Sequence, residues 1–343
     1  MKKRVIRMTM VMILLLLVIP LAASAMDVEQ AEELTPIESY TYPITSDSPD
    51  WFNYTVLEKV EMLRIPEETL ARMTDEALIQ AIVDYPYFGD LGLYGPVENA
   101  VQTCRKYFSA LDELMSRSTV QDSLRTYGMQ VLESSAVTAN AVHDDWRSAL
   151  VVVEMQKLIN YLCDDFSVEV QYDEEHEVYT TRAVVQTPNG SYVSVLRPEE
   201  NCPSTYHPNK DAYAVSTYDV TLISGGTCKY NCHSYAWHSR STSNPYWIND
   251  PAVYMSDGSY TRTYNGNPAQ TYLGSGIQMG DIIYYGSGSH SAVVSSSNTT
   301  ASSDPIAYTV CISKWGNAGV FRHALTEVPA EYITSSITAW RRA

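Results

Sequence analysis

The chain has 343 residues, and its 23 basic and 40 acidic side chains give a formal net charge of −17 at pH 7. A surface that follows nucleic-acid phosphates needs an excess of Lys and Arg, so this charge argues against a nucleic-acid partner. Only 18% of the residues are charged and 45% are hydrophobic. This composition excludes a coiled coil or a disordered acidic chain and suffices for one large domain or two ordinary ones.

Residues 1–25 have the three parts of a secretory signal peptide. Four basic residues come first, an apolar run follows over 11–21, and Ala23, Ser24 and Ala25 provide small residues for cleavage. The apolar run is short for a bilayer, which takes about 20 residues to cross. We therefore expect a cleaved, secreted or extracellular protein with no stable membrane insertion.

Charge divides the rest of the chain into two parts. Residues 26–180 carry 9 basic and 30 acidic side chains, whereas residues 181–343 carry 10 of each. The second part is also rich in Ser, Thr, Gly and Tyr. Such a break predicts two domains. The expected segments are an acidic linker over 26–50, a helical accessory domain over 51–166 and a second domain over 175–343.

The acidic part has the residue spacing of helices. Val56, Val60 and Leu63 recur at i, i+4 and i+7. Thr74 is placed to cap a helix that contains the run ALIQAIV. Further periodic stretches cover 97–116, 119–134 and 144–163. We find no nucleophile with a partner here, so the pattern indicates a helical accessory domain.

The second part predicts short strands around one helix. Two β-rich runs flank Pro188, Asn189 and Gly190, and a turn between strands favours Asn and Gly. Asn231 can cap a short helix that runs from Cys232 to about Arg240. The other predicted strands cover 213–223, 280–285, 290–294 and 307–313. This order is typical of an α+β fold.

Cys232 lies at the predicted start of that helix, where a nucleophilic thiol would be useful. The free N–H groups and the helix dipole favour the thiolate there and can hold an oxyanion. His290 begins a predicted strand after a Gly-Ser loop and is the best candidate for the general base. The order of Cys before His is that of papain-like enzymes.

The six cysteines also allow structural roles. The preferred arrangement has two disulfides, Cys104–Cys163 and Cys202–Cys228, and leaves the other two cysteines as thiols. A Cys228–Cys232 disulfide is the main alternative. Cys228 and Cys232 together with nearby histidines would also supply the ligand types of a zinc site. The chain has no second Cys or His pair at zinc-finger spacing, so we expect neither a metal nor another cofactor.

The segment YNCHSYAWH, followed by MGDIIYYGSGSHSAVV, resembles the core of the NlpC-type and CHAP-type cell-wall cysteine peptidases and amidases. In those families a Cys starts a helix, a Gly-Asp-hydrophobic strand follows, and a His opens the next strand. The similarity covers about residues 215–325. It implies an α+β, papain-like C-terminal domain with Cys232 as the nucleophile and His290 as the base. The helical part only loosely resembles N-terminal regions of secreted Gram-positive proteins.

The same families place a polar residue on the following strand, where it orients the histidine. Here that strand is YTVCISKWG, and we expect Ser313 in this role, with Asn317 as the second choice. Neither is a typical orienting residue. We expect structural roles for His233 and His238, whereas His323 is a candidate for the wall of the cleft.

An aromatic and acidic segment at and after the helix provides candidates for substrate binding. They are Trp237, Tyr246, Trp247, Asp250 and Asp257. Aromatic rings pack against sugars and peptide stems, and carboxylates bind amines. The alternative is that this aromatic cluster has a purely structural role and packs the helix against the loop.

The resemblance implies a secreted, cell-wall-associated cysteine hydrolase that cleaves amide bonds in peptidoglycan stem peptides or cross-bridges. Two alternatives remain. One is a non-catalytic secreted binding protein that keeps the fold, and the other is an amidase or transpeptidase that acts on another protein. The sequence does not indicate the oligomeric state.

Overall fold

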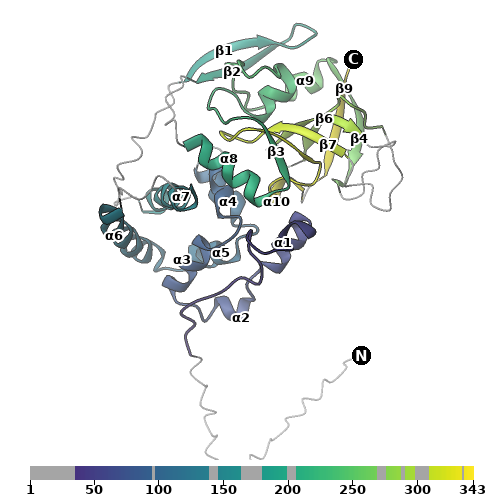
Figure 1. Cartoon of the computed structure of the whole chain (residues 1–343). Helices are drawn as coiled ribbons and strands as arrows, with labels where there is room; N and C mark the ends of the chain where they lie inside the picture. Colours follow the sequence, from purple (N-terminus) through teal and green to yellow (C-terminus); the bar gives the residue numbers. More distant parts are fainter. Residues whose placement is uncertain are drawn as a thin grey trace, which may run out of the picture. The chain divides into compact units, whose positions relative to one another are not determined.

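The computed structural model describes residues 35–94, 97–138, 146–163, 180–198, 206–268, 276–286, 290–297, 309–333 and 336–343. The predicted signal peptide and Cys202 lie outside these ranges. The described residues are 41% helical and 22% strand, which agrees with the α+β class. Residues 36–343 form one compact unit (Figure 1). No helix in the described ranges is both long and apolar enough to cross a membrane.

The acidic part is helical, as predicted. Thr74 caps the third helix, because its hydroxyl oxygen accepts a hydrogen bond of 3.1 Å from the Ala77 N–H. The helices are α1 (Val56–Met62), α2 (Glu67–Leu70), α3 (Asp75–Val83), α4 (Val97–Cys104), α5 (Ser109–Ser116), α6 (Val120–Thr138) and α7 (Trp146–Leu162), with 3-10 turns η1 (Trp51–Asn53) and η2 (Phe88–Gly92).

The second part contains a two-stranded hairpin and a seven-stranded antiparallel sheet in the order β3-β8-β7-β6-β5-β9-β4. The hairpin turns at Gly190, whose φ of 88° suits glycine. The strands are β1 (Thr180–Gln186), β2 (Tyr192–Pro198), β3 (Val220–Ser224), β4 (Tyr260–Gly266), β5 (Ile282–Tyr285), β6 (Ser291–Ser297), β7 (Thr309–Lys314), β8 (Val320–Ala324) and β9 (Ile337–Arg342). The helices of this part are α8 (Tyr206–Thr217), α9 (Ala252–Ser256), α10 (Ala330–Ile333) and the π-helix η3 (Ser234–His238).

The strand predicted over 213–223 is wrong in its first half, which belongs to α8. Buried side chains of α8 recur at helical spacing, at Lys210, Tyr213, Ala214 and Thr217. The Tyr213 hydroxyl donates a 2.8 Å hydrogen bond to the buried carboxylate of Asp90. This long-range contact favours a helix where the local residue types favour a strand.

One hydrophobic core contains buried residues from the helices and from the sheet, such as Leu78 of α3, Ile283 of β5 and Phe321 of β8. A polar link adds to it, since the Trp51 indole N–H donates to the Thr217 carbonyl at 2.7 Å. The expected domain limits of 51–166 and 175–343 stay predictions.

The predicted Cys104–Cys163 disulfide is wrong, because both residues are thiols. Their sulfurs pack against different neighbours. The Cys104 sulfur lies 3.6 Å from the Tyr107 hydroxyl, whereas the Cys163 sulfur lies 3.6 Å from the Gln121 carbonyl oxygen. Cysteine types and chain order do not reveal such separate packing, which only the tertiary fold decides.

Candidate active site

A capped helix start positions Cys232. The side-chain oxygen of Asn231 accepts hydrogen bonds from the N–H groups of Ser234 at 3.0 Å and Ile248 at 3.3 Å. The first of these is the N-cap contact predicted from the sequence, which is confirmed. The side-chain amide nitrogen of Asn231 donates to the Ile248 carbonyl at 2.7 Å. The chain then turns through η3, a π-helical segment of a kind that is frequent at functional sites.

The Cys232 sulfur lies at the start of β6. Backbone N–H groups of Ser291, His233 and Cys232 itself donate to it, and Ser291 directly follows His290 in the chain. Cys232 is a thiol, so the alternative Cys228–Cys232 disulfide is wrong. Cys228 is disulfide-bonded, which removes its thiolate from the zinc alternative. Its predicted partner, Cys202, lies outside the described ranges.

Sheet register brings Ser313 to His290. Strands β6 and β7 are antiparallel neighbours, so the start of β6 lies beside the end of β7. The Nε2 atom of His290 is 3.1 Å from the Ser313 hydroxyl oxygen. The His290 ring is buried and stacks on Tyr332 of α10, with ring centroids 4.5 Å apart and planes at 8°.

The Ser313 hydroxyl has three neighbours, and their chemistry fixes its proton. The Trp315 indole N–H, 2.9 Å away, is only a donor. The Nε2 atom of His323 lies 2.7 Å from the hydroxyl. The Nδ1 atom of His323 lies 2.8 Å from the carbonyl oxygen of Ala324, which can only accept. In neutral His323 the proton is therefore on Nδ1, and Nε2 accepts the Ser313 proton.

Because Ser313 has one proton and donates it to His323, its oxygen must accept from His290. Neutral His290 therefore carries its proton on Nε2 and has a bare Nδ1. An unprotonated ring nitrogen is what a histidine needs to act as a general base, and in His290 this nitrogen is Nδ1. The tautomer follows from hydrogen-bond chemistry across three strands, because Ser313 lies on β7 and His323 on β8.

Both histidines are uncharged at neutral pH. Burial, followed by the nearby His323 and His233, holds the pKa of His290 well below its ordinary value. Burial also lowers the pKa of His323 to about 4, although its hydrogen bond to Ala324 opposes this effect. The ring of His290 therefore has an unprotonated nitrogen at pH 7, and the lowered pKa also makes it a weaker base.

Burial raises the pKa of the Cys232 thiol to about 11. The N–H donors and the buried Lys314 oppose this shift but do not overcome it. Burial thus opposes the thiolate that the helix start favours. The resting site therefore combines a neutral thiol with a neutral imidazole.

Cys232 opens into a cavity of about 600 Å³. Trp247, His233 and Asn249 line it, and residues of α4 line it as well. Tyr332 also belongs to the lining and covers His290 by stacking. Neither α4 nor Tyr332 carried a sequence signal for this role.

The other predicted substrate-binding residues are not in the described lining of this cavity. Trp237 is buried against Tyr260, with ring centroids 5.1 Å apart, so it seals the core. Tyr246 packs on His238 at 5.6 Å. The Asp250 carboxylate accepts a 2.8 Å hydrogen bond from the Ala252 N–H at the start of α9.

Asp257 supports the hairpin. Its carboxylate accepts hydrogen bonds from the Thr187 hydroxyl and, at 2.8 Å, from the Ser259 N–H. These donors lower the pKa of Asp257 to about 2. The carboxylate is thereby engaged at the β1–β2 turn.

The remaining candidates lie around the site. His233 is buried, as expected for a packing residue, with its Nδ1 2.8 Å from the Ser291 hydroxyl oxygen. His323, a candidate for the cleft wall, is buried behind Ser313. For Asn317, the hydrogen bond is made by the backbone carbonyl oxygen, which lies 2.8 Å from Nδ1 of His207.

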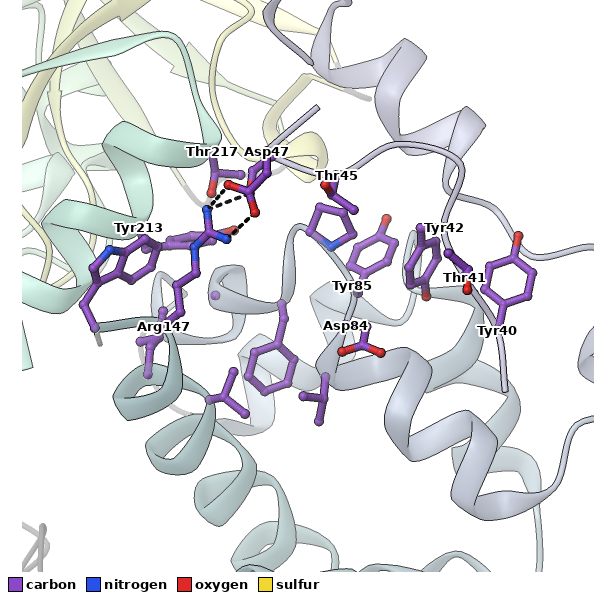
Figure 2. Close-up of a pocket in the computed structure, with 18 residues that line it drawn as sticks. Tyr40, Thr41, Tyr42, Thr45, Asp47, Asp84, Tyr85, Arg147, Tyr213 and Thr217 are labelled. Atoms are coloured by element: carbon purple, nitrogen blue, oxygen red, sulfur yellow. Dashed lines mark hydrogen bonds and ion pairs between the residues drawn. The ribbon is translucent and has the colours of Figure 1, made fainter. Parts of the chain in front are cut away.

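A second cavity, of about 400 Å³, lies among the helices (Figure 2). Tyr40, Tyr42 and Tyr85 line it, and Arg147 forms an ion pair of 2.6 Å with Asp47 at its edge. Its described lining contains no Cys or His. We therefore place the candidate chemistry at Cys232. Across the described ranges, no group of three or more His, Cys, Asp or Glu is arranged to hold a metal ion.

Comparisons with known protein families, with curated proteins and with solved structures found no match for this chain.

Proposed function

We propose that the protein is a secreted cysteine peptidase or amidase with a papain-like C-terminal domain. Its proposed substrates are amide bonds in peptidoglycan stem peptides or cross-bridges. One observation carries the proposal: the Ser313 hydrogen bonds leave Nδ1 of His290 as a base at the strand start where the Cys232 sulfur lies. The cell-wall substrate rests on the resemblance of the Cys232 and His290 segments to cell-wall enzymes.

In the proposed reaction the Cys232 sulfur attacks the substrate carbonyl while Nδ1 of His290 takes the thiol proton. Because both groups start neutral, proton transfer accompanies the attack. Backbone N–H groups near the sulfur stabilise the oxyanion. The His290 imidazolium then donates its proton to the leaving amine as the C–N bond breaks. Water attacks the resulting thioester, which releases the carboxylic acid and restores the thiol.

The test compares two alanine variants of buried thiols, Cys232→Ala and Cys311→Ala. Each is incubated with purified sacculi, and soluble muropeptides are measured by liquid chromatography and mass spectrometry. We expect Cys232→Ala to abolish release and Cys311→Ala to retain it, since Cys311 is a buried strand residue away from the cavity lining. Undiminished release by Cys232→Ala would contradict the proposal.

A second function is a secreted binding protein that keeps this fold without catalysis. The raised pKa of Cys232 and the Tyr332 ring stacked on His290 favour it. Sacculi that retain the protein on sedimentation but release no fragments would support binding alone. A product that carries a new amine would instead indicate transpeptidation.

A further inference from the structure

One face of α4 forms a wall of the Cys232 cavity. Its polar lining residues are Asn99, Gln102, Thr103 and Lys106. Their spacing of i, i+3, i+4 and i+7 is that of one helix face, and the last of them lies just past the helix end. The opposite face, with Ala100, Val101 and Cys104, is buried in the core. We call the four lining residues the α4 stripe.

Most of the α4 stripe is unengaged by the residues that the structure describes. Asn99 and Gln102 are exposed and Thr103 is half-buried. In the described ranges, none of these three side chains has a hydrogen-bond partner, although they face a cavity that contains the proposed nucleophile. Lys106 differs, because it forms a 2.5 Å ion pair with Glu331.

We propose that the α4 stripe binds the main chain of an extended peptide substrate, an inference that rests on the proposed function. Each carboxamide offers one donor group and one acceptor, which match the peptide N–H and C=O groups. From Asn99 to Thr103 the helix rises about 6 Å at 1.5 Å per residue. That length equals about two residues of extended chain.

Charge around the cavity narrows the substrate class. The described lining contains no carboxylate, and the two predicted amine binders are engaged elsewhere. Asp250 accepts from the Ala252 N–H, and Asp257 accepts from Thr187 and Ser259. The described lining therefore offers no carboxylate to pair with an amine of the bound segment.

The test uses two reagents that alkylate Cys232 in the full mature chain. Iodoacetamide has no peptide main chain, whereas N-acetyl-trialanyl chloromethyl ketone carries one. Mass spectrometry of the Cys232 peptide gives both rate constants at one pH. Their ratio, peptidyl over iodoacetamide, is independent of how much thiol is ionised.

We expect the double variant Asn99→Ala/Gln102→Ala to lower this ratio by about 5- to 100-fold, as for two lost hydrogen bonds. Glu98→Ala is the matched control, since Glu98 is exposed on α4 but is outside the cavity lining. An unchanged ratio in the double variant, or an equal fall in the control, overturns the inference alone. A Cys232 that reacts with neither reagent when folded, yet is alkylated after unfolding, refutes the proposed function and this inference together.

Discussion

Replacing His323 by leucine removes the acceptor of the Ser313 proton. In the native chain, the Nδ1–H tautomer of His290 would set a bare Nε2 against a hydroxyl whose proton is already donated to His323. A buried acceptor without a donor costs about 1–3 kcal/mol. This cost corresponds to a roughly 5- to 150-fold preference for the Nε2–H tautomer.

In His323→Leu the Ser313 hydroxyl can either donate to His290 or accept from it, so this preference disappears. The base-competent tautomer should fall from more than about four fifths of molecules to about half. Because about half of the molecules keep the base-competent tautomer, any peptidase activity would fall only about twofold. The tautomer populations themselves are therefore the more informative measurement. His323→Gln is the matched control, because a glutamine oxygen can accept the Ser313 proton.

Long-range ¹H–¹⁵N spectra of protein labelled with ¹⁵N-histidine measure this directly at pH 7, since protonated and bare ring nitrogens have well-separated shifts. We expect Nε2–H for His290 in the native protein and in His323→Gln, and a mixture in His323→Leu. A native His290 with its proton on Nδ1 would refute the deduction from Ser313. Equal populations in all three proteins would show that His323 does not hold the Ser313 proton.

Two predictions concern pH. Since burial raises the pKa of Cys232 to about 11, its alkylation by iodoacetamide should accelerate about tenfold per pH unit up to that value; a rate that levels off below pH 8 would contradict this. Burial also raises the pKa of Asp90 to about 7, although three tyrosine hydroxyls donate to it. The native state then holds a proton that the unfolded state has lost, so its contribution to stability disappears as pH rises from about 4 to 7, on the order of 4 kcal/mol in all. Urea unfolding at several pH values should show a flatter curve for Asp90→Asn, and parallel curves would count against the assignment.

The parts of the site that the sequence predicts are those with local causes. Asn231 caps its helix through contacts three residues away, so residue type and position are enough. The contact between Ser313 and His290 follows from strand order, because consecutive antiparallel strands place the end of one beside the start of the next. Contacts between residues far apart in the chain cannot be predicted from local sequence patterns. Tyr213 of α8 and Tyr218 just after it favour a strand by type, whereas their hydrogen bonds to the buried Asp90 favour the helix.

Substrate binding shows the same division more sharply. Trp237 and Trp247 lie in one aromatic segment, yet one is buried in the core and the other lines the cavity. Residue type cannot separate them, because an aromatic ring serves either environment. The α4 stripe poses the opposite difficulty. A helix with a polar face has the same periodicity whether that face meets water or a substrate, so helical spacing alone predicts a solvated surface. What distinguishes Asn99 and Gln102 is their place in the cavity that Cys232 also lines, more than a hundred residues later in the chain. The helical part, which has the composition of an accessory domain, therefore contains α4, and variants of α4 give the most direct test of what this site binds.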